Sequence, residues 1–431
     1  MDAGDTAFIL FASALVMFMT PGLALFYGGL VRQKNVLSTI MHSFVALAII
    51  SVVWFVAGYA IGFGPDRWGG FIGGGKHYFL EGVSFTEAGP IATEIPHGAF
   101  MVFQLMFAII TPALISGAFA ERLKFGGYVA FITLWSLLVY SPIAHWVWGG
   151  GWLGQRGVLD FAGGTVVHIN AGIAALAFAI YLGKRKGWPK DIAPPHNVPM
   201  TVLGAGILWF GWFGFNAGSQ LAAGGAALPF VTTHLATAAA VIGWALIEKI
   251  RNGKVTTVGV ATGAVAGLVA VTPAAGFVLP WAAMIIGFVA GIVCYLAINL
   301  KYRFGYDDSL DVVGVHFVGG VIGALLTGVF AEASLDFLDG SGGGVAGNWG
   351  QIADQLLGIG ATIGFSLVLS LLIMVVVDKT IGLRASDEDE VSGLDLALHS
   401  ESAYSTTDVG AAVGAPAPVA GGQDRPAGPI G

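Results

Sequence analysis

Two stretches, far apart in the chain, are built alike around a histidine. Residues 168–176 read HINAGIAAL and residues 316–324 read HFVGGVIGA, so small and apolar residues follow each histidine. An acid shortly precedes each one, Asp160 in the first stretch and Asp311 in the second. Small residues at this spacing let helices pack closely. The match predicts an internal repeat whose two halves each contribute one histidine.

The composition around these stretches is that of a membrane protein. Of the 431 residues, 56% are hydrophobic and only 10% are charged, whereas a soluble domain carries about 25% charged residues. The 66 glycines agree, because glycine is more frequent in membrane helices than in soluble ones. The net charge of −7 without a basic patch argues against a nucleic-acid partner. The single cysteine, Cys294, rules out a disulfide framework within the chain.

Eleven apolar runs approach or exceed the length of about 20 residues that a helix needs to cross a bilayer. They are expected to be helices, because lipid offers backbone groups no hydrogen-bond partner and a barrel would show alternating hydrophobicity. We therefore predict an all-α polytopic membrane protein with eleven transmembrane helices. The runs are 6–31, 37–63, 98–119, 128–147, 164–183, 198–217, 225–247, 256–272, 279–299, 313–330 and 352–377.

The two histidines fall in the fifth and tenth runs. Two halves of five helices have opposite topology because five is odd. The expected architecture is therefore an inverted 5+5 repeat plus one extra C-terminal helix. In transporters built this way the transport path lies at the interface of the two repeats, near the middle of the membrane.

Basic residues predict the orientation. The 19 lysines and arginines, except Arg67, Lys76 and Arg156, lie in every second connection between the apolar runs or at the C-terminal end. The basic side is cytoplasmic, which places the N-terminus outside and the C-terminus inside. Residues 1–380 are expected to form the transmembrane domain of a multi-pass cell-membrane protein, and 381–431 a cytoplasmic tail. The Ala/Gly/Pro-rich end predicts disorder after about residue 408.

Ionisable residues within membrane spans are rare and usually functional. A single buried histidine is more often a structural residue, but two at repeat-related positions favour function. A neutral imidazole offers one donor and one acceptor nitrogen. The spans contain no ring of carboxylates or carbonyls that a pore for a bare cation needs, and burying such an ion costs on the order of 20 kcal/mol by the Born estimate. This favours a solute that sheds its charge, as ammonium can and potassium cannot.

Aromatic side chains near the outer ends of the spans could recruit a cation. Aromatic faces attract cations by roughly 0.5–2 kcal/mol, and a nearby hydroxyl adds an acceptor. The alternative is an ordinary interfacial belt of aromatic residues, which is common at membrane edges. The candidates on the third, fourth and sixth runs are Phe103, Phe107, Trp148, Trp212, Phe215 and Ser219.

Motifs for other chemistry are absent. The sequence has no HExxH, GxSxG, Walker loop or CxxC, so we expect neither an enzyme nor a bound metal or cofactor. A sensor of ammonium that signals through its tail is the alternative to a transporter. The tail is short and low in complexity, which does not favour a signalling domain.

Five motifs together resemble those of the ammonium transporter (Amt/Mep/Rh) family, from about residue 6 to 404. They are FQLMFAIIT (103–111), AER (120–122), DFAGGTVVHINAG (160–172), GWFGFNAGS (211–219) and DDSLDVVGVH (307–316). The resemblance implies a homotrimer of eleven-helix subunits, each with its own pore for ammonium or ammonia. Trp148 and Ser219 favour the bacterial Amt branch over the Rh branch.

The resemblance also implies roles for individual residues. Trp148, Phe107 and Ser219 would form an outer ammonium site, and Phe107 and Phe215 would form a stacked gate below it. Asp160 would support the outer site by orienting local groups and favouring the cation. From the residues alone, Asp160 could equally be an N-cap of the fifth helix, a task that an asparagine also performs.

His168 and His316 would be the twin histidines that line the pore. Phe317 follows His316 where many relatives carry a glycine, so packing beside the pore is expected to differ there. Three further residues would support the outer site and the pore from behind: Phe103, Gln104 and Trp212.

The tail resembles that of bacterial family members, which cooperates with a PII-type signalling protein at the cytoplasmic face. We expect an extended polar strip in which residues 387–390 pair with the basic loops at 184–190 and 249–254. The alternative is an inert solvated tail. The outer loop 64–97 and the tail after Tyr404 match no family pattern from which a role could be inferred.

Overall fold

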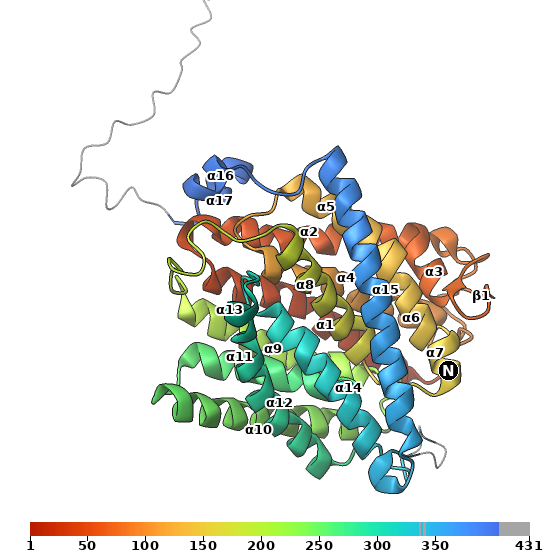
Figure 1. Ribbon diagram of the computed structural model, residues 1–431. Helices are drawn as coiled ribbons and strands as arrows, with labels where there is room; N and C mark the ends of the chain where they lie inside the picture. Colours follow the sequence, from red (N-terminus) through yellow and green to blue (C-terminus); the bar gives the residue numbers. More distant parts are fainter. Residues whose placement is uncertain (336–337, 339–341, 405–431) are drawn as a thin grey trace, which may run out of the picture.

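The fold follows from the apolar runs, each of which closes its backbone hydrogen bonds within a helix. The computed structural model describes residues 1–335, 338 and 342–404. The expected disorder after about residue 408 lies outside these residues. Figure 1 shows long helices packed side by side, with α15 crossing the front of the bundle. The helices of the first five spans are α1 (Ala3–Leu30), α2 (Val36–Val53) with α3 (Tyr59–Phe63), α4 (His97–Phe119), α5 (Phe125–Trp135) with α6 (Ser141–Val147), and α8 (Asn170–Tyr181).

The second half repeats this order. Its helices are α9 (Val198–Gly218), α10 (Ala227–Asn252), α11 (Thr257–Val271), α12 (Pro280–Ile298) with α13 (Leu300–Phe304), and α14 (Val318–Phe330), followed by α15 (Gly350–Thr380). All eleven expected spans coincide with helices, and the all-α membrane fold is confirmed. Ten of the described helical segments are long and apolar enough to cross a membrane. The eighth expected span is the 15-residue helix α11.

Turns of π-helix occur in four of the spans: two lie within a span and two begin one. They cover Trp54–Gly58, Ser136–Tyr140, Gly164–Ile169 and Val313–Phe317. The last two contain His168 and His316. A π-helical turn is one residue wider than an α-helical turn and often marks a functional site. Neither hydropathy nor helix propensity predicts such a turn, so it could not be expected from the sequence.

Glycine lets the two halves cross closely beside the histidines. Gly172 and Gly320 occupy the same position after their histidines. A Cβ on Gly172 would lie 2.4 Å from the backbone nitrogen of Phe317, and one on Gly320 would lie 3.1 Å from the Cβ of His168. Each half therefore packs the residues after its histidine against the wide turn of the other half.

The connections expected on the cytoplasmic side gather at one end, where buried charges join them. Glu121 accepts hydrogen bonds from Arg32 and Arg185 at 3.0 Å each, and Arg185 also binds Asp307. Burial opposes the ionisation of Glu121, but the hydrogen bond from Arg32 and the charges of Arg185 and Arg32 outweigh it and lower its pKa below the ordinary value. These ion pairs fix the inner ends of several spans relative to one another.

The tail lies against this end as two short helices, α16 (Asp387–Ser392) and α17 (Leu394–His399), rather than as an extended strip. Asp395 caps the start of α2 by accepting from the backbone N–H groups of Leu37 and Ser38. Of the two expected basic loops, 184–190 contributes a pair, Lys186 with Asp387 at 2.5 Å. Within the described ranges no ion pair joins 249–254 to the tail.

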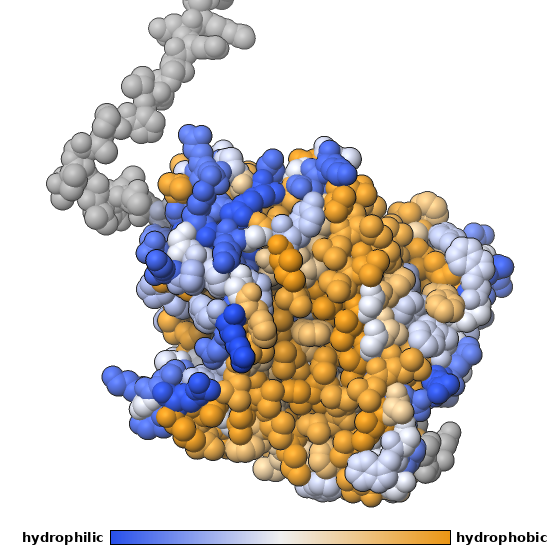
Figure 2. Space-filling model, viewed as in Figure 1, coloured by the Kyte–Doolittle hydropathy of each residue, from blue (hydrophilic) through white to orange (hydrophobic). Residues whose placement is uncertain are grey.

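The opposite end carries the outer loop, where β1 (Asp66–Arg67) pairs with β2 (Ile72–Gly73) beside the short helix α7 (Trp152–Arg156). Figure 2 shows a broad apolar surface between the two ends, on the face that it draws. Hydrophilic residues gather near α16 and α17 on one side of it and near β1 on the other. This is the surface that a protein embedded in a bilayer presents.

Candidate functional site

The outer end of the bundle contains a cavity of about 400 Å³ with an aromatic floor. Trp148 and Phe107 meet edge to face, with ring centroids 5.9 Å apart. The indole N–H of Trp148 donates to the backbone oxygen of Asp160 at 2.8 Å, which fixes the ring. The Ser219 hydroxyl donates to the Phe215 carbonyl at 2.8 Å, so its oxygen lone pairs remain free to accept. Phe103 and Gln104 also line this cavity.

Gln104 lines the outer cavity, but its amide oxygen is not exposed to it. Its Oε1 atom is buried and has no hydrogen-bond partner among the described residues. The Ser219 hydroxyl and the aromatic faces are the groups of the outer cavity that suit a small hydrogen-bonding cation.

Two phenylalanines close the bottom of the outer cavity. The ring centroids of Phe107 and Phe215 are 4.3 Å apart, and each side chain is only 1% exposed. The residues come from α4 and α9, one helix from each half. Together they separate the outer cavity from the space beneath it.

The histidines meet beneath this pair of rings. The Nδ1 atoms of His168 and His316 lie 3.3 Å apart, and both side chains line a central cavity of about 10 Å³. His168 also lies nearly parallel to Trp212 and Phe215, with centroids 5.5 and 6.1 Å away. The structure therefore brings together the two histidines that the sequence repeat had picked out.

Asp160 lies behind the outer cavity and turns its carboxylate toward the backbone. It accepts from the N–H groups of Gly163, Gly164, Thr165 and Val166 at 2.6–3.1 Å, and from the hydroxyl of Thr165. Its carboxylate does not line the outer cavity. It holds the start of the fifth span in place, while its carbonyl holds Trp148.

The second half has the same arrangement, but its acid is Asp308 and not Asp311 as the sequence repeat suggested. Asp308 stands as many positions before His316 as Asp160 stands before His168. It accepts from the N–H groups of Val312 and Val313 at 3.1 and 2.7 Å. Asp311 instead pairs with Lys301 at 2.6 Å. Burial raises the pKa of Asp308 to about 6, although the charge of Lys301 opposes this.

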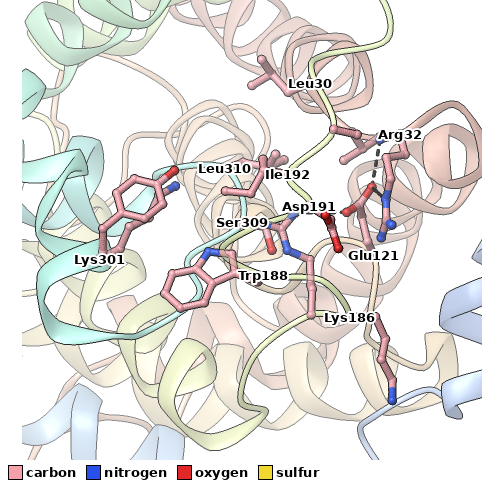
Figure 3. Close-up of a pocket in the computed structure, with 14 residues that line it drawn as sticks. Leu30, Arg32, Glu121, Lys186, Trp188, Asp191, Ile192, Lys301, Ser309 and Leu310 are labelled. Atoms are coloured by element: carbon pink, nitrogen blue, oxygen red, sulfur yellow. Dashed lines mark hydrogen bonds and ion pairs between the residues drawn. The ribbon is translucent and has the colours of Figure 1, made fainter.

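Two smaller cavities continue from the histidines to the end of the bundle against which the tail lies. One of about 50 Å³ shares Phe26, Val265 and His316 with the central cavity. The next, of about 70 Å³, shares Leu30 and Leu310 with it. Figure 3 shows this last cavity, where Arg32 reaches Glu121 and the rings of Trp188 and the side chains of Asp191 and Lys301 surround the opening.

The four cavities form an interrupted path from one end of the molecule to the other. The wide outer part is aromatic and the narrow centre is apolar except for two imidazoles and one indole. The inner mouth is lined by charged side chains. This order of surroundings suits a small polar solute that is bound outside, stripped of water and charge in the centre, and released into an aqueous compartment.

Comparison with known proteins identifies the solute. The family described as Ammonium Transporter Family matches residues 7–404. The chain belongs to this family. The ammonium transporter of Bacillus subtilis is 50% identical over 406 residues, which cover 94% of this chain and 99% of the relative. The ammonium transporter of Aquifex aeolicus is also 50% identical, over 94% of each chain.

Solved structures agree with the fold of this ammonium transporter. Mep2 of Candida albicans superposes with a TM-score of 0.84 at 37% identity, over 90% of this chain and 88% of that one. A chain called Sensor Amt Protein has the same TM-score at 31% identity, over 92% and 98% of the two chains. The protein is thus a membrane transporter of ammonium and not an enzyme, and it belongs to the cell membrane as a multi-pass protein.

Proposed function

We propose that this transporter recruits ammonium in the outer cavity, removes its proton, and conducts ammonia, with or without the proton, past His168 and His316. Trp148, Phe107 and Ser219 are the recruiting groups. Three features support this assignment: the two aromatic faces attract a cation, the serine oxygen can accept a hydrogen bond, and the cavity opens toward the outer end.

Loss of the charge is needed because of what lies below. Phe107 and Phe215 form the gate, and the central cavity beyond it holds at most one water-sized molecule. No carboxylate lines this cavity. A cation would enter without its hydration shell and without a counter-charge, whereas ammonia can exchange hydrogen bonds with the two imidazoles. The contact between these imidazoles is the observation that carries the proposal.

The test is to replace both histidines with leucine and to measure transport in liposomes. We expect the flux of ammonium to collapse, or its discrimination against potassium to be lost, while the protein still elutes as a single folded species. Single replacements serve as controls for packing. Normal flux with normal selectivity in the folded double variant would refute the proposal.

We further propose that three copies assemble and that a PII-type protein controls the inner mouth. His234 supports assembly, because it is exposed on α10, a helix apolar enough to cross a membrane, and ionisable residues on such helices normally face protein and not lipid. Lys186 supports control, because it lines the inner cavity and also pairs with Asp387 of the tail. Native mass measurement, with and without a PII protein, tests both statements.

The alternative function, ammonium sensing, lacks a specific observation in its favour. The described part of the tail consists of two six-residue helices docked on the transporter. The similarity to the chain called Sensor Amt Protein extends over the transporter fold itself, so it does not separate sensing from transport.

A further inference from the structure

The central cavity contains one polar group that the proposed path does not use. Besides the two histidines, its lining consists of methionine, leucine, isoleucine, valine and phenylalanine side chains and the indole of Trp212. An indole N–H is a hydrogen-bond donor only. In an apolar cavity such a donor would bind the lone pair of ammonia and would hold it there.

Thr272 removes this donor from the path. The Nε1 atom of Trp212 donates to the Thr272 hydroxyl at 2.9 Å, and that hydroxyl donates in turn to the Leu268 carbonyl at 2.7 Å. Thr272 is completely buried at the end of α11 and does not line the cavity. The indole N–H is therefore committed to a group that lies outside the path.

The same bond fixes the ring on which His168 lies. The His168 and Trp212 rings are 5.5 Å apart at an angle of 22°. The Nε2 atom of His168 is buried and has no hydrogen-bond partner among the described residues. Without the bond to Thr272, nothing in the described part of the chain would hold the Trp212 indole N–H, and the ring would be free to change its position relative to His168.

We propose that Thr272 is a positioning residue for ammonia conduction: it holds the indole of Trp212 against His168 and keeps the indole N–H away from the solute. The proposal rests on the proposed function of the histidine pair. A purely structural role, in which Thr272 only satisfies a buried donor, would affect stability but not the flux carried by each folded molecule.

The experiment compares three variants reconstituted in liposomes, with flux expressed per folded protein. Thr272→Val keeps the shape and removes the hydroxyl, and Thr272→Ser keeps the hydroxyl. Thr237→Val is the matched control, because Thr237 is equally buried and donates to Thr233 at 2.7 Å, yet binds no indole.

We expect Thr272→Val to lower ammonium flux by about tenfold, which corresponds to ~1.4 kcal/mol and is about the net strength of one hydrogen bond between the freed indole N–H and ammonia. Thr272→Ser and Thr237→Val should stay within about twofold of the parent, since each keeps the bond to Trp212. Parent-like flux in folded Thr272→Val would overturn the proposal.

A double-variant cycle keeps the test decisive if Thr272→Val folds poorly. In Trp212→Phe the indole N–H is gone, so adding Thr272→Val strands no donor and should not lower the flux further. Independent, multiplying losses would mean that Thr272 does not act through Trp212. The histidine double variant tells the two proposals apart: if it transports normally, the proposed path is wrong, whatever Thr272 does.

Discussion

Replacing Asp160 with asparagine should cost far more than the loss of an ordinary N-cap. The two carboxylate oxygens of Asp160 divide four backbone N–H groups between them, two on each. Asparagine can keep one oxygen with its two donors, but its NH₂ group faces the other two. At about 1.5–3 kcal/mol for each hydrogen bond to a charged acceptor, the loss is about 3–6 kcal/mol.

Asp308 provides a matched comparison within the same molecule. Its carboxylate accepts from only two backbone N–H groups, one on each oxygen, so an asparagine there loses one bond, or about 1.5–3 kcal/mol. Burial raises the pKa of Asp308 to about 6, so burial opposes the charged form of this carboxyl group. Asp160→Asn should therefore be the more destabilising of the two.

The assay is thermal unfolding of the purified proteins in detergent, followed by the loss of the monodisperse elution peak, together with flux in liposomes. Asp160→Asn should melt well below Asp308→Asn. It should also lose transport, because the indole of Trp148 donates a hydrogen bond to the backbone oxygen of the same residue. An Asp160→Asn protein that melts like the parent would show that these donors are satisfied without the charge. The reverse order of the two variants would contradict the bond count.

Three further changes test other parts of the structure. Trp148→Leu should raise the half-saturation concentration of transport by up to roughly 30-fold, or ~2 kcal/mol; an unchanged value would mean that the outer site is wrongly assigned. Truncation after Tyr404 should leave transport intact, whereas truncation at Leu383 should lower it or abolish PII binding; equal behaviour would make the tail a passive end. The pKa of Glu121 is lowered in the folded protein, so the stability from its ion pairs is present above its ordinary pKa of about 4.5 and is lost as the pH falls below it. Glu121→Gln should therefore lower the melting temperature at pH 7 and have less effect at acid pH, and a loss that does not depend on pH would contradict this.

The spans and the histidine pair were predictable because lipid leaves the backbone few choices. An apolar run of sufficient length must be helical, and a polar residue inside it must face another span. The choice of Asp311 over Asp308 was wrong because three acids, Asp307, Asp308 and Asp311, stand close together before His316. Only the direction of the backbone N–H groups at Val312 and Val313 distinguishes a capping acid from one that pairs with Lys301.

The prediction of an extended tail was also wrong, although the sequence contains a signal for a helix there. Ser386 and Asp389 form a reciprocal capping box at the start of α16, a spacing that typically begins a helix. The run of acids that follows suggested a solvated strip instead. What no sequence pattern contained was the surface on which the tail docks: Asn35 accepts from the backbone N–H of Leu394 in the tail, and Asp395 of the tail accepts from the N–H of Ser38 at the start of α2.

The short distance between the two Nδ1 atoms has a consequence for direction. A hydrogen bond between two identical ring nitrogens needs a proton on one and none on the other, so the pair adopts one of two opposite tautomeric arrangements. In each arrangement one ring exposes a protonated Nε2 and the other an unprotonated one. A proton that passed along the pair would leave each ring in the opposite tautomer. A second proton could pass in the same direction only after both rings had returned to their original tautomers. The contact between His168 and His316 therefore has a direction along the path, from the donor ring to the acceptor ring, although the fold around it is a symmetric repeat.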